Sequence, residues 1–111
     1  MTFDEIMEKV QQTASELDCK DVAFMAIQVK LTGANGGVFY VEIKDGKATA
    51  APYEYNDHSC IIIMEPINFV KLLDGKLDPI LAYTSGKLKV EGDLAKALQF
   101  SKYMKRQAAV T

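Results

Sequence analysis

The stretch LLDGKLDPILAYTSGKLKVEGD, residues 72–93, contains the tripeptide Gly-Lys-Leu at residues 75–77 and again at residues 86–88. A phosphate-binding loop of the Walker type needs a glycine five residues before Gly-Lys and a Ser or Thr directly after it. Val70 and Leu81 stand at the glycine positions instead, and leucine follows both lysines. These residues disfavour nucleotide binding and favour a structural role for both copies.

Both glycines stand where a helix is predicted to end. The apolar residues before Gly75 have helical spacing, and glycine readily takes the left-handed conformation that follows a helix end. Asp78 and Pro79 then have the pattern of an N-cap and a first helical residue, and Gly86 ends this second short helix. Residues 87–91 alternate between charged and apolar side chains, which predicts a strand with one exposed face.

The composition limits the functions that the chain can have. Its 111 residues carry a formal net charge of −2 at pH 7, with two cysteines and one histidine. This length predicts a single domain over residues 1–111, and the charge predicts no nucleic-acid partner. Cys19 and Cys60 lack metal-ligand spacing, and one histidine cannot complete a zinc site with them. We therefore predict reduced thiols and neither a metal nor another cofactor.

The two ends of the sequence carry no targeting signal that we recognise. Acidic residues stand among the first ten residues and no long apolar run follows, so neither a signal peptide nor a membrane span is predicted. The last residues do not match the Ser-Lys-Leu peroxisomal address. The resulting expectation is a cytoplasmic location.

The first half of the chain predicts one amphipathic helix followed by strands. Residues 3–17 place apolar side chains on one helical face, and Thr2 and Glu5 have the spacing of a capping box. Alternating or continuous apolar residues then predict strands over residues 22–31, 38–44, 47–54 and 58–64. Turn residues separate the first three strands at Asn35-Gly36-Gly37 and Asp45-Gly46, and Pro52 predicts an edge position.

A last amphipathic helix is predicted over residues 93–106. Its inward face is expected to hold Leu94, Ala97, Leu98 and Met104, with Phe100 and Tyr103 broadening the apolar stripe. Three basic residues are expected near the C-terminal end of this helix, where the helix dipole favours positive charge: Lys102, Lys105 and Arg106. The weaker alternative is that they bind the phosphate of an acyl-CoA or of a lipid headgroup. The order of elements predicts an α+β fold, in which helices cover one face of a single, mainly antiparallel sheet.

The second half of the chain also carries a longer pattern. It reads Phe-x-x-Leu-x-x-Gly-Lys, then a proline, then Ala-aromatic, then Gly-Lys-hydrophobic-Lys-hydrophobic-x-Gly. The matching residues are Phe69, Leu72, Gly75, Lys76, Leu77, Pro79, Ala82, Tyr83, Gly86, Lys87, Leu88, Lys89, Val90 and Gly92. This pattern, together with the order of the preceding elements, resembles the sterol carrier protein 2 family of sterol-binding or lipid-transfer domains. Glu65-Pro66 departs from it, since family members often have a polar N-cap there.

The resemblance implies a five-stranded sheet under a layer of helices, with an apolar tunnel between the two layers. It implies a non-catalytic protein that binds a sterol, fatty acid, acyl-CoA or phospholipid and transfers it inside the cell, in transient contact with a membrane or an enzyme. The alternative is an accessory module that presents an apolar substrate to a partner enzyme. The candidate lipid-binding residues are Phe69, Leu72, Leu73, Leu77, Leu81, Tyr83, Leu98, Phe100 and Met104. Without the resemblance, the same residues would be interpreted as ordinary core.

The stretch YEYNDHSC, residues 53–60, is the strongest candidate for catalysis, through Tyr55, Asp57 or His58. Successive side chains of a strand point to opposite faces, so His58 cannot form a relay with the residues on either side of it. His58 and Cys60 share a face, but two strand steps separate them by too much for a nucleophile-base hydrogen bond. An enzyme acting on a steroid or acyl ester is therefore the weakest hypothesis.

Overall fold

The computed structural model describes residues 2–17, 20, 22–34, 36–54 and 60–101. The elements in chain order are α1 (Phe3–Glu16), β1 (Met25–Leu31), β2 (Gly37–Lys44), β3 (Lys47–Ala51), β4 (Cys60–Met64), α2 (Pro66–Leu73), α3 (Pro79–Thr84) and β5 (Leu88–Gly92). A further helix covers residues 94–101. The expected order of helices and strands is confirmed.

The strands form one five-stranded sheet in the order β3-β2-β1-β4-β5. Neighbouring strands are antiparallel except β1 and β4, which run parallel with Val29 opposite Ile62. The predicted α+β fold with a mainly antiparallel sheet is confirmed, and the parallel pair is a detail that the sequence pattern does not predict. It arises because the chain crosses back from the edge strand β3 to the far side of β1. Pro52 directly follows β3, in agreement with the predicted edge.

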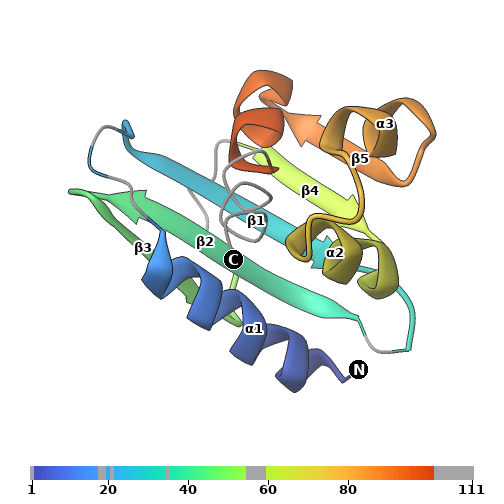
Figure 1. The fold of residues 1–111 in the computed structure, drawn as a ribbon, viewed down its shortest axis with the longest axis horizontal. Helices are drawn as coiled ribbons and strands as arrows, with labels where there is room; N and C mark the ends of the chain where they lie inside the picture. The colour runs from blue at the N-terminus through green and yellow to red at the C-terminus, as the bar shows by residue number, and fades with distance from the viewer. Residues whose placement is uncertain (1, 18–19, 21, 35, 55–59, 102–111) are drawn as a thin grey trace.

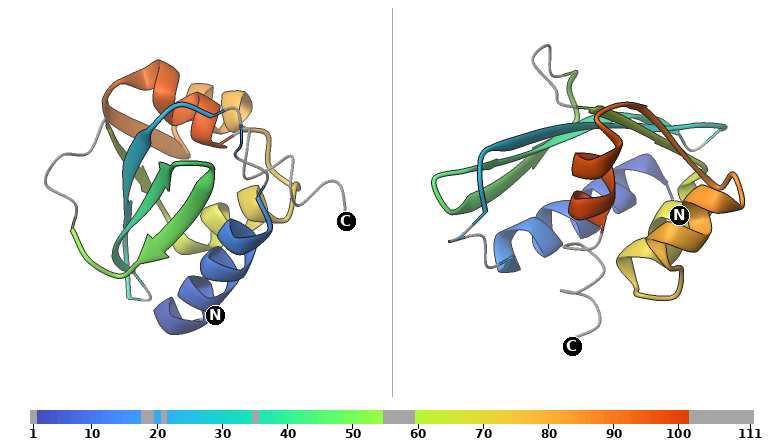
Figure 2. Two further views of the ribbon diagram at one scale, coloured as in Figure 1. Left: turned by 90° about the vertical axis from the view of Figure 1, so that its left-hand side faces the viewer. Right: turned by 90° about the horizontal axis from the view of Figure 1, so that it is seen from above.

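All the described helices lie on one face of this sheet (Figures 1 and 2). The strand residues that face the helices are apolar and mostly buried, whereas the alternate positions carry exposed charged residues such as Lys30, Lys44 and Lys89. One face of the sheet therefore forms the floor of the apolar core and the other faces solvent.

Helix α1 begins with the predicted capping box. The Thr2 side-chain oxygen accepts a hydrogen bond from the Glu5 backbone N–H at 3.2 Å, and the Thr2 N–H donates to Glu5 Oε1 at 2.9 Å. The buried stripe consists of Ile6, Met7, Val10 and Ala14. The backbone of α1 comes close to β3, because the small side chains of Ala14, Ala48 and Ala50 allow it. This part of the layer is therefore tightly closed.

The Gly-Lys-Leu tripeptides form the same turn after α2 and α3. Gly75 and Gly86 have φ of 73° and 82°, and each lysine N–H donates to the carbonyl five residues earlier, at 2.8 Å in both turns. This is the Schellman arrangement that ends helices with a left-handed glycine. Leu77 and Leu88 then return to the core, the first partly buried and the second fully. The predicted structural role of both tripeptides is confirmed.

Helix 94–101 presents most of the predicted face to the core, with one exception. Leu94 is exposed, whereas Ala97, Phe100 and Ser101 are buried. The prediction is therefore wrong for Leu94, which belongs to the first turn that follows β5, and confirmed for Ala97 and Phe100. The Ser101 hydroxyl donates to the Ala97 carbonyl at 2.9 Å, which satisfies a polar group at a buried position.

Candidate functional site

The interior beneath α2 is filled by aromatic rings from three elements. Phe69 of α2 packs edge-to-face on Phe39 of β2 with ring centroids 5.5 Å apart, and Phe3 of α1 lies 6.3 Å from Phe39. Phe39 and Phe69 are fully buried. No strand of the sheet approaches the α2 backbone as closely as β3 approaches α1, so large side chains fill the wider space there.

The predicted lipid-binding residues divide into an inner and an outer group. Phe69, Leu72, Leu73 and Phe100 are buried together in the core, and Leu77 is partly buried against it. Leu98 is half-buried on helix 94–101. Leu81 and Tyr83 lie on the outer surface of α3, where 66% and 39% of their areas are exposed. Met104 lies outside the described residues.

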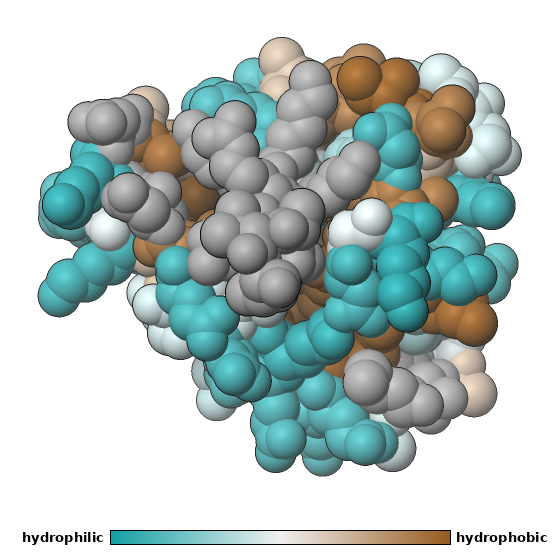
Figure 3. Space-filling view, in the orientation of Figure 1, coloured by the Kyte–Doolittle hydropathy of each residue, from teal (hydrophilic) through white to brown (hydrophobic). Residues whose placement is uncertain are grey.

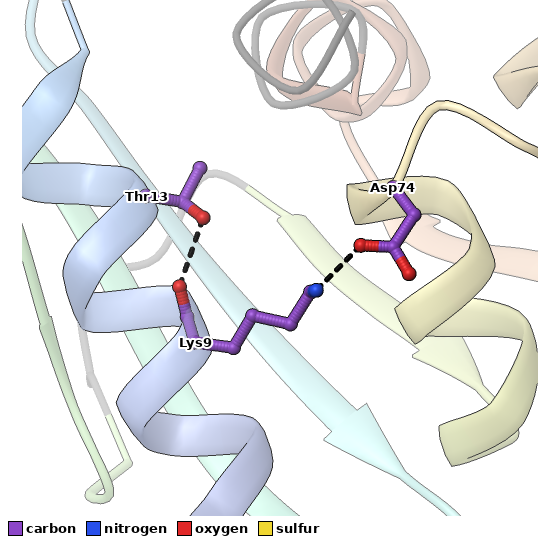
Figure 4. A network of polar contacts seen from close by, with 3 residues as sticks. All are labelled: Lys9, Thr13 and Asp74. Carbon is purple, nitrogen blue, oxygen red and sulfur yellow. Dashed lines mark hydrogen bonds and ion pairs between the residues drawn. The ribbon is translucent and has the colours of Figure 1, made fainter. Parts of the chain in front are cut away.

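An ion pair joins α1 to the end of α2. Lys9 Nζ lies 2.5 Å from Asp74 Oδ1, and the Thr13 hydroxyl donates to the Lys9 carbonyl one turn along α1 (Figure 4). Both charged side chains are about one-third exposed, so the pair contributes less than about 1 kcal/mol. Its role is positional, since it fixes the C-terminal end of α2 relative to α1.

Among the described residues, the interior offers little to acid-base chemistry. Ser101 is the buried polar residue of this part of the chain, and no buried side-chain polar atom there lacks a hydrogen bond. Burial raises the pKa of the Cys60 thiol to about 11, with a smaller contribution in the same direction from Asp93. At neutral pH this thiol is protonated and a poor nucleophile. The interior therefore favours an apolar guest over a reacting one.

The catalytic candidates Tyr55, Asp57 and His58 lie outside the described residues, as do Cys19, Lys102, Tyr103, Lys105 and Arg106. Within the described ranges, no group of His, Cys, Asp and Glu side chains is arranged to hold a metal ion. In the same part of the chain, no helix is both long and apolar enough to cross a membrane.

Two hollows on the surface are lined by other residues. A shallow one of about 470 Å³ lies beside the Asp45-Gly46 turn, with Val22 and Phe24 in its wall. A second of about 210 Å³ lies where α2 begins and α3 ends, and its wall includes Asn68, Lys87 and Lys89. Neither contains a residue of the predicted lipid-binding set.

Sequence reasoning missed two contributors to this interior. Phe39 is the ring on which both other phenylalanines pack, and Phe3 approaches it from α1. The alternation in residues 38–44 does place Phe39 on the inner face, but only the register with β1, which sets it opposite Val29, brings it beneath α2. The family pattern lies downstream of both residues and gives no signal for them.

The fold and this interior agree with what is found in known proteins. The sequence pattern of the SCP-2 sterol transfer family matches residues 3–105, so the chain belongs to that family of lipid-binding and lipid-transfer domains. It is 35% identical over 78 residues to hydroxysteroid dehydrogenase-like protein 2 of Bos taurus, a match that covers 69% of this chain and 19% of that protein. It is 29% identical over 100 residues to sterol carrier protein 2 of Homo sapiens, covering 89% of this chain and 18% of that protein.

Solved structures share the architecture. The solution structure of palmitated SCP2L2 from Aedes aegypti superposes with a TM-score of 0.73 at 15% identity, covering 94% of this chain and 95% of that one. The chain matches nearly the full length of that structure, but spans less than a fifth of the length of the two relatives named above.

Proposed function

We propose that this chain binds an acyl-chain lipid or sterol between its helices and sheet, and carries it through water without changing it chemically. The observation that supports this most directly is the apolar interior beneath α2, where large side chains rather than close backbone contacts fill the space. The protonated Cys60 thiol and the hydrogen-bonded Ser101 hydroxyl leave no reactive group there among the described residues. Membership of the SCP-2 sterol transfer family supports the same class of ligand.

The free energy of burial favours such a guest. Each buried methylene contributes about 0.8 kcal/mol, so a sixteen-carbon chain gains on the order of 12 kcal/mol before ordering costs are subtracted. Phe69 and Phe39 already fill the interior, so a guest must displace side chains. We place this displacement at α2, because α1 lies close to β3 through alanines and has less room to move.

In this proposal the wall of the lipid site consists of Phe69, Leu72, Leu73, Leu77, Leu98 and Phe100, with Met104 as a further candidate. Leu81 and Tyr83 contact lipid outside the interior, since both are exposed on α3. Fatty acids are the first ligands to test, because the similar structure from Aedes aegypti is palmitated. Sterol, acyl-CoA and phospholipid come next.

A second function is an accessory module that presents an apolar substrate to an enzyme. It is favoured by the match to hydroxysteroid dehydrogenase-like protein 2, of which the chain spans only 19%. The enzyme contact could then be made by another part of the same polypeptide or by a separate partner. Recovery of a stoichiometric enzyme partner in a pull-down would favour this function over free transfer.

Native mass spectrometry of freshly purified protein tests the proposed function. The expected result is a discrete added mass that disappears on solvent extraction, followed by identification of the extracted lipid. A protein that remains at its bare mass after incubation with fatty acid, sterol and acyl-CoA would contradict it. The accessory-module reading would then stand first.

A further inference from the structure

Helices α2 and α3 expose a group of large apolar side chains. The exposed fractions are 62% for Ile67, 47% for Ile80, 66% for Leu81 and 39% for Tyr83. The two helices lie at the same end of the helical layer (Figures 1 and 2), and apolar surface is gathered where α3 lies (Figure 3). Single exposed apolar side chains are ordinary, but such a group on neighbouring helices indicates a contact surface.

Exposed lysines accompany these side chains, and we call the two sets together the α2–α3 face. Its lysines are Lys71, Lys76 and Lys87. Within the described part of the chain, none of these ammonium groups forms an ion pair. Of the nearby acids, Asp74 pairs with Lys9, whereas Asp78, which caps α3, and the exposed Glu65 carry the remaining carboxylates. The three lysines outnumber these two carboxylates. The α2–α3 face is therefore locally positive although the chain as a whole is negative.

The hollow of about 210 Å³ lies at the edge of this face, between the start of α2 and the end of α3. Lys87, Lys89 and Asn68 bring ammonium and amide donors to its wall, and Glu65 offsets one of the two positive charges. The Ser85 hydroxyl already donates to the Ala82 carbonyl. The ammonium and amide donors are the groups that hydrogen-bond a phosphate or carboxylate of a lipid headgroup.

Helix α1 has the opposite character. Its basic residue Lys9 forms an ion pair with Asp74. Its exposed acidic residues are Asp4, Glu5, Glu8 and Glu16. An anionic surface would repel the carboxylates of α1 and attract the lysines of the α2–α3 face. Both effects act within about a Debye length of that surface. The charge distribution thus selects one orientation of the molecule.

We propose that the α2–α3 face docks on the surface of an anionic phospholipid bilayer, with its apolar side chains in the interface and its lysines against the headgroups. Apolar side chains with unpaired lysines among them complement the boundary between acyl chains and phosphates. A protein partner would need carboxylates placed to match these lysines, and nothing in the described chain selects such a partner. The inference rests on the proposed function, since a carrier must meet the membrane from which it takes its lipid.

Sedimentation with extruded vesicles tests the docking. Vesicles of phosphatidylcholine alone are compared with vesicles that also contain phosphatidylserine, at low and physiological salt. We expect wild-type protein to bind the phosphatidylserine vesicles, and the binding to weaken as salt is raised.

The informative variants are the pairs I67S/L81S and K76E/K87E, whose positions are all exposed. We expect the first pair to weaken binding by about tenfold or more, since two large side chains leave the interface. We expect about fivefold or more from each charge reversal. The matched controls are F24S and K47E. Phe24 directly precedes β1. Because β1 runs parallel to β4, Phe24 lies at one end of the sheet and α2 begins at the other. Lys47 lies on the edge strand β3.

Absence of vesicle binding, binding that survives both paired variants, or an equal loss in the controls would overturn the proposal. Equal melting temperatures of the variants and wild type show that a loss is not a folding defect. Fatty-acid binding is measured in the same samples without vesicles. If the protein binds fatty acid but not vesicles, the docking proposal is wrong and the proposed function stands. If it binds vesicles but no fatty acid in solution, the proposed function is contradicted and the docking stands.

Discussion

Gly75 and Gly86 end α2 and α3 by the same backbone device, although the two helices differ in length and sequence. Each glycine has a positive φ, and the lysine after it closes the last turn through its backbone N–H. The side chains of Lys76 and Lys87 are thereby left exposed, which places them on the α2–α3 face. The sequence predicts both turns because the conformational freedom of glycine is a local property.

The two kinds of constraint on glycine are separable by substitution. At Gly86 no atom lies within 4 Å of an added Cβ, so G86A should cost only backbone strain, about 1 kcal/mol. At Gly36 the Cβ would lie 2.1 Å from the Leu31 carbonyl oxygen, so G36A should cost more than about 2 kcal/mol. Urea denaturation of both variants measures the difference, and equal losses would contradict this account.

Cys60 should be unreactive as long as the protein is folded. Burial raises its pKa to about 11, above the ordinary value of 9.0, so the folded state holds the thiol proton more tightly than the unfolded state. Below the ordinary pKa this preference has no effect on stability, and the free energy of unfolding should fall as pH rises from about 9 towards 11.

A C19S variant isolates the Cys60 thiol for this measurement. Reaction with a maleimide at neutral pH should be much slower in the folded protein than in urea, and the additional loss of stability at high pH should be absent from C19S/C60A. Rapid labelling of folded C19S protein would show that the thiol is neither buried nor protonated.

At the scale of the element, α1 is the helix that local sequence determines most completely. Its cap, its length and its buried stripe all agree with the prediction from residues 3–17. Helix 94–101 is the contrasting case, because Leu94 and Phe100 are both apolar and periodicity alone does not decide which of them faces the core. The position of β5 decides it, by fixing the direction in which the chain enters the helix.

The capping box of α1 gives a prediction for T2A. Loss of the side-chain acceptor should lower the free energy of unfolding by about 1 kcal/mol. Hydrogen bonds from the Thr2 backbone and side chain lower the pKa of Glu5, so the stability that they provide should be present above the ordinary pKa of Glu5 and lost as pH falls through the lowered value. S15A in the last turn of α1 is the matched control and should cost nothing, since alanine favours helix. Equal effects of T2A and S15A would contradict the assignment.

At the scale of the whole molecule, the sheet and the helical layer combine a part with close backbone contacts and a part filled by large side chains. α1 lies close to β3 through small side chains, whereas Phe69 and the leucines of α2 fill a wider space above β2 and β1. The Lys9–Asp74 ion pair connects the two parts at one end of α2. A guest between the layers would therefore move α2 more readily than α1.

Binding of a guest should stabilise the folded protein by mass action. A fatty acid at one hundred times its Kd adds about 2.7 kcal/mol to the free energy of unfolding, so the melting temperature should rise with lipid concentration. F69A should lower stability by about 3 to 4 kcal/mol and change the response to lipid, while F24A on the surface should respond as wild type does. Melting curves that coincide with and without lipid would contradict binding in the interior.

The candidate site was predictable in part. Phe69 and Leu72 could be identified from the sequence because the family pattern and the helical spacing both mark them, and Leu73 because of the helical spacing. The structure buries all three. Tyr83 also belongs to the family pattern, but Tyr83 and Leu81 are both exposed, since α3 is a short helix whose buried residues are Pro79 and Ala82. Phe39 was not predicted as a wall residue, because its contact with Phe69 joins segments far apart in the chain.

The sequence by itself determined the elements, their caps and turns, and the family to which the chain belongs. These depend on interactions between residues a few positions apart, such as capping hydrogen bonds, side-chain periodicity and the left-handed glycines. Only the tertiary structure decided the parallel pairing of β1 with β4, the aromatic packing beneath α2 and the gathering of exposed apolar and basic residues on the α2–α3 face. Each of these depends on contacts between distant segments, and such contacts are fixed by the packing of the whole core and not by any local pattern.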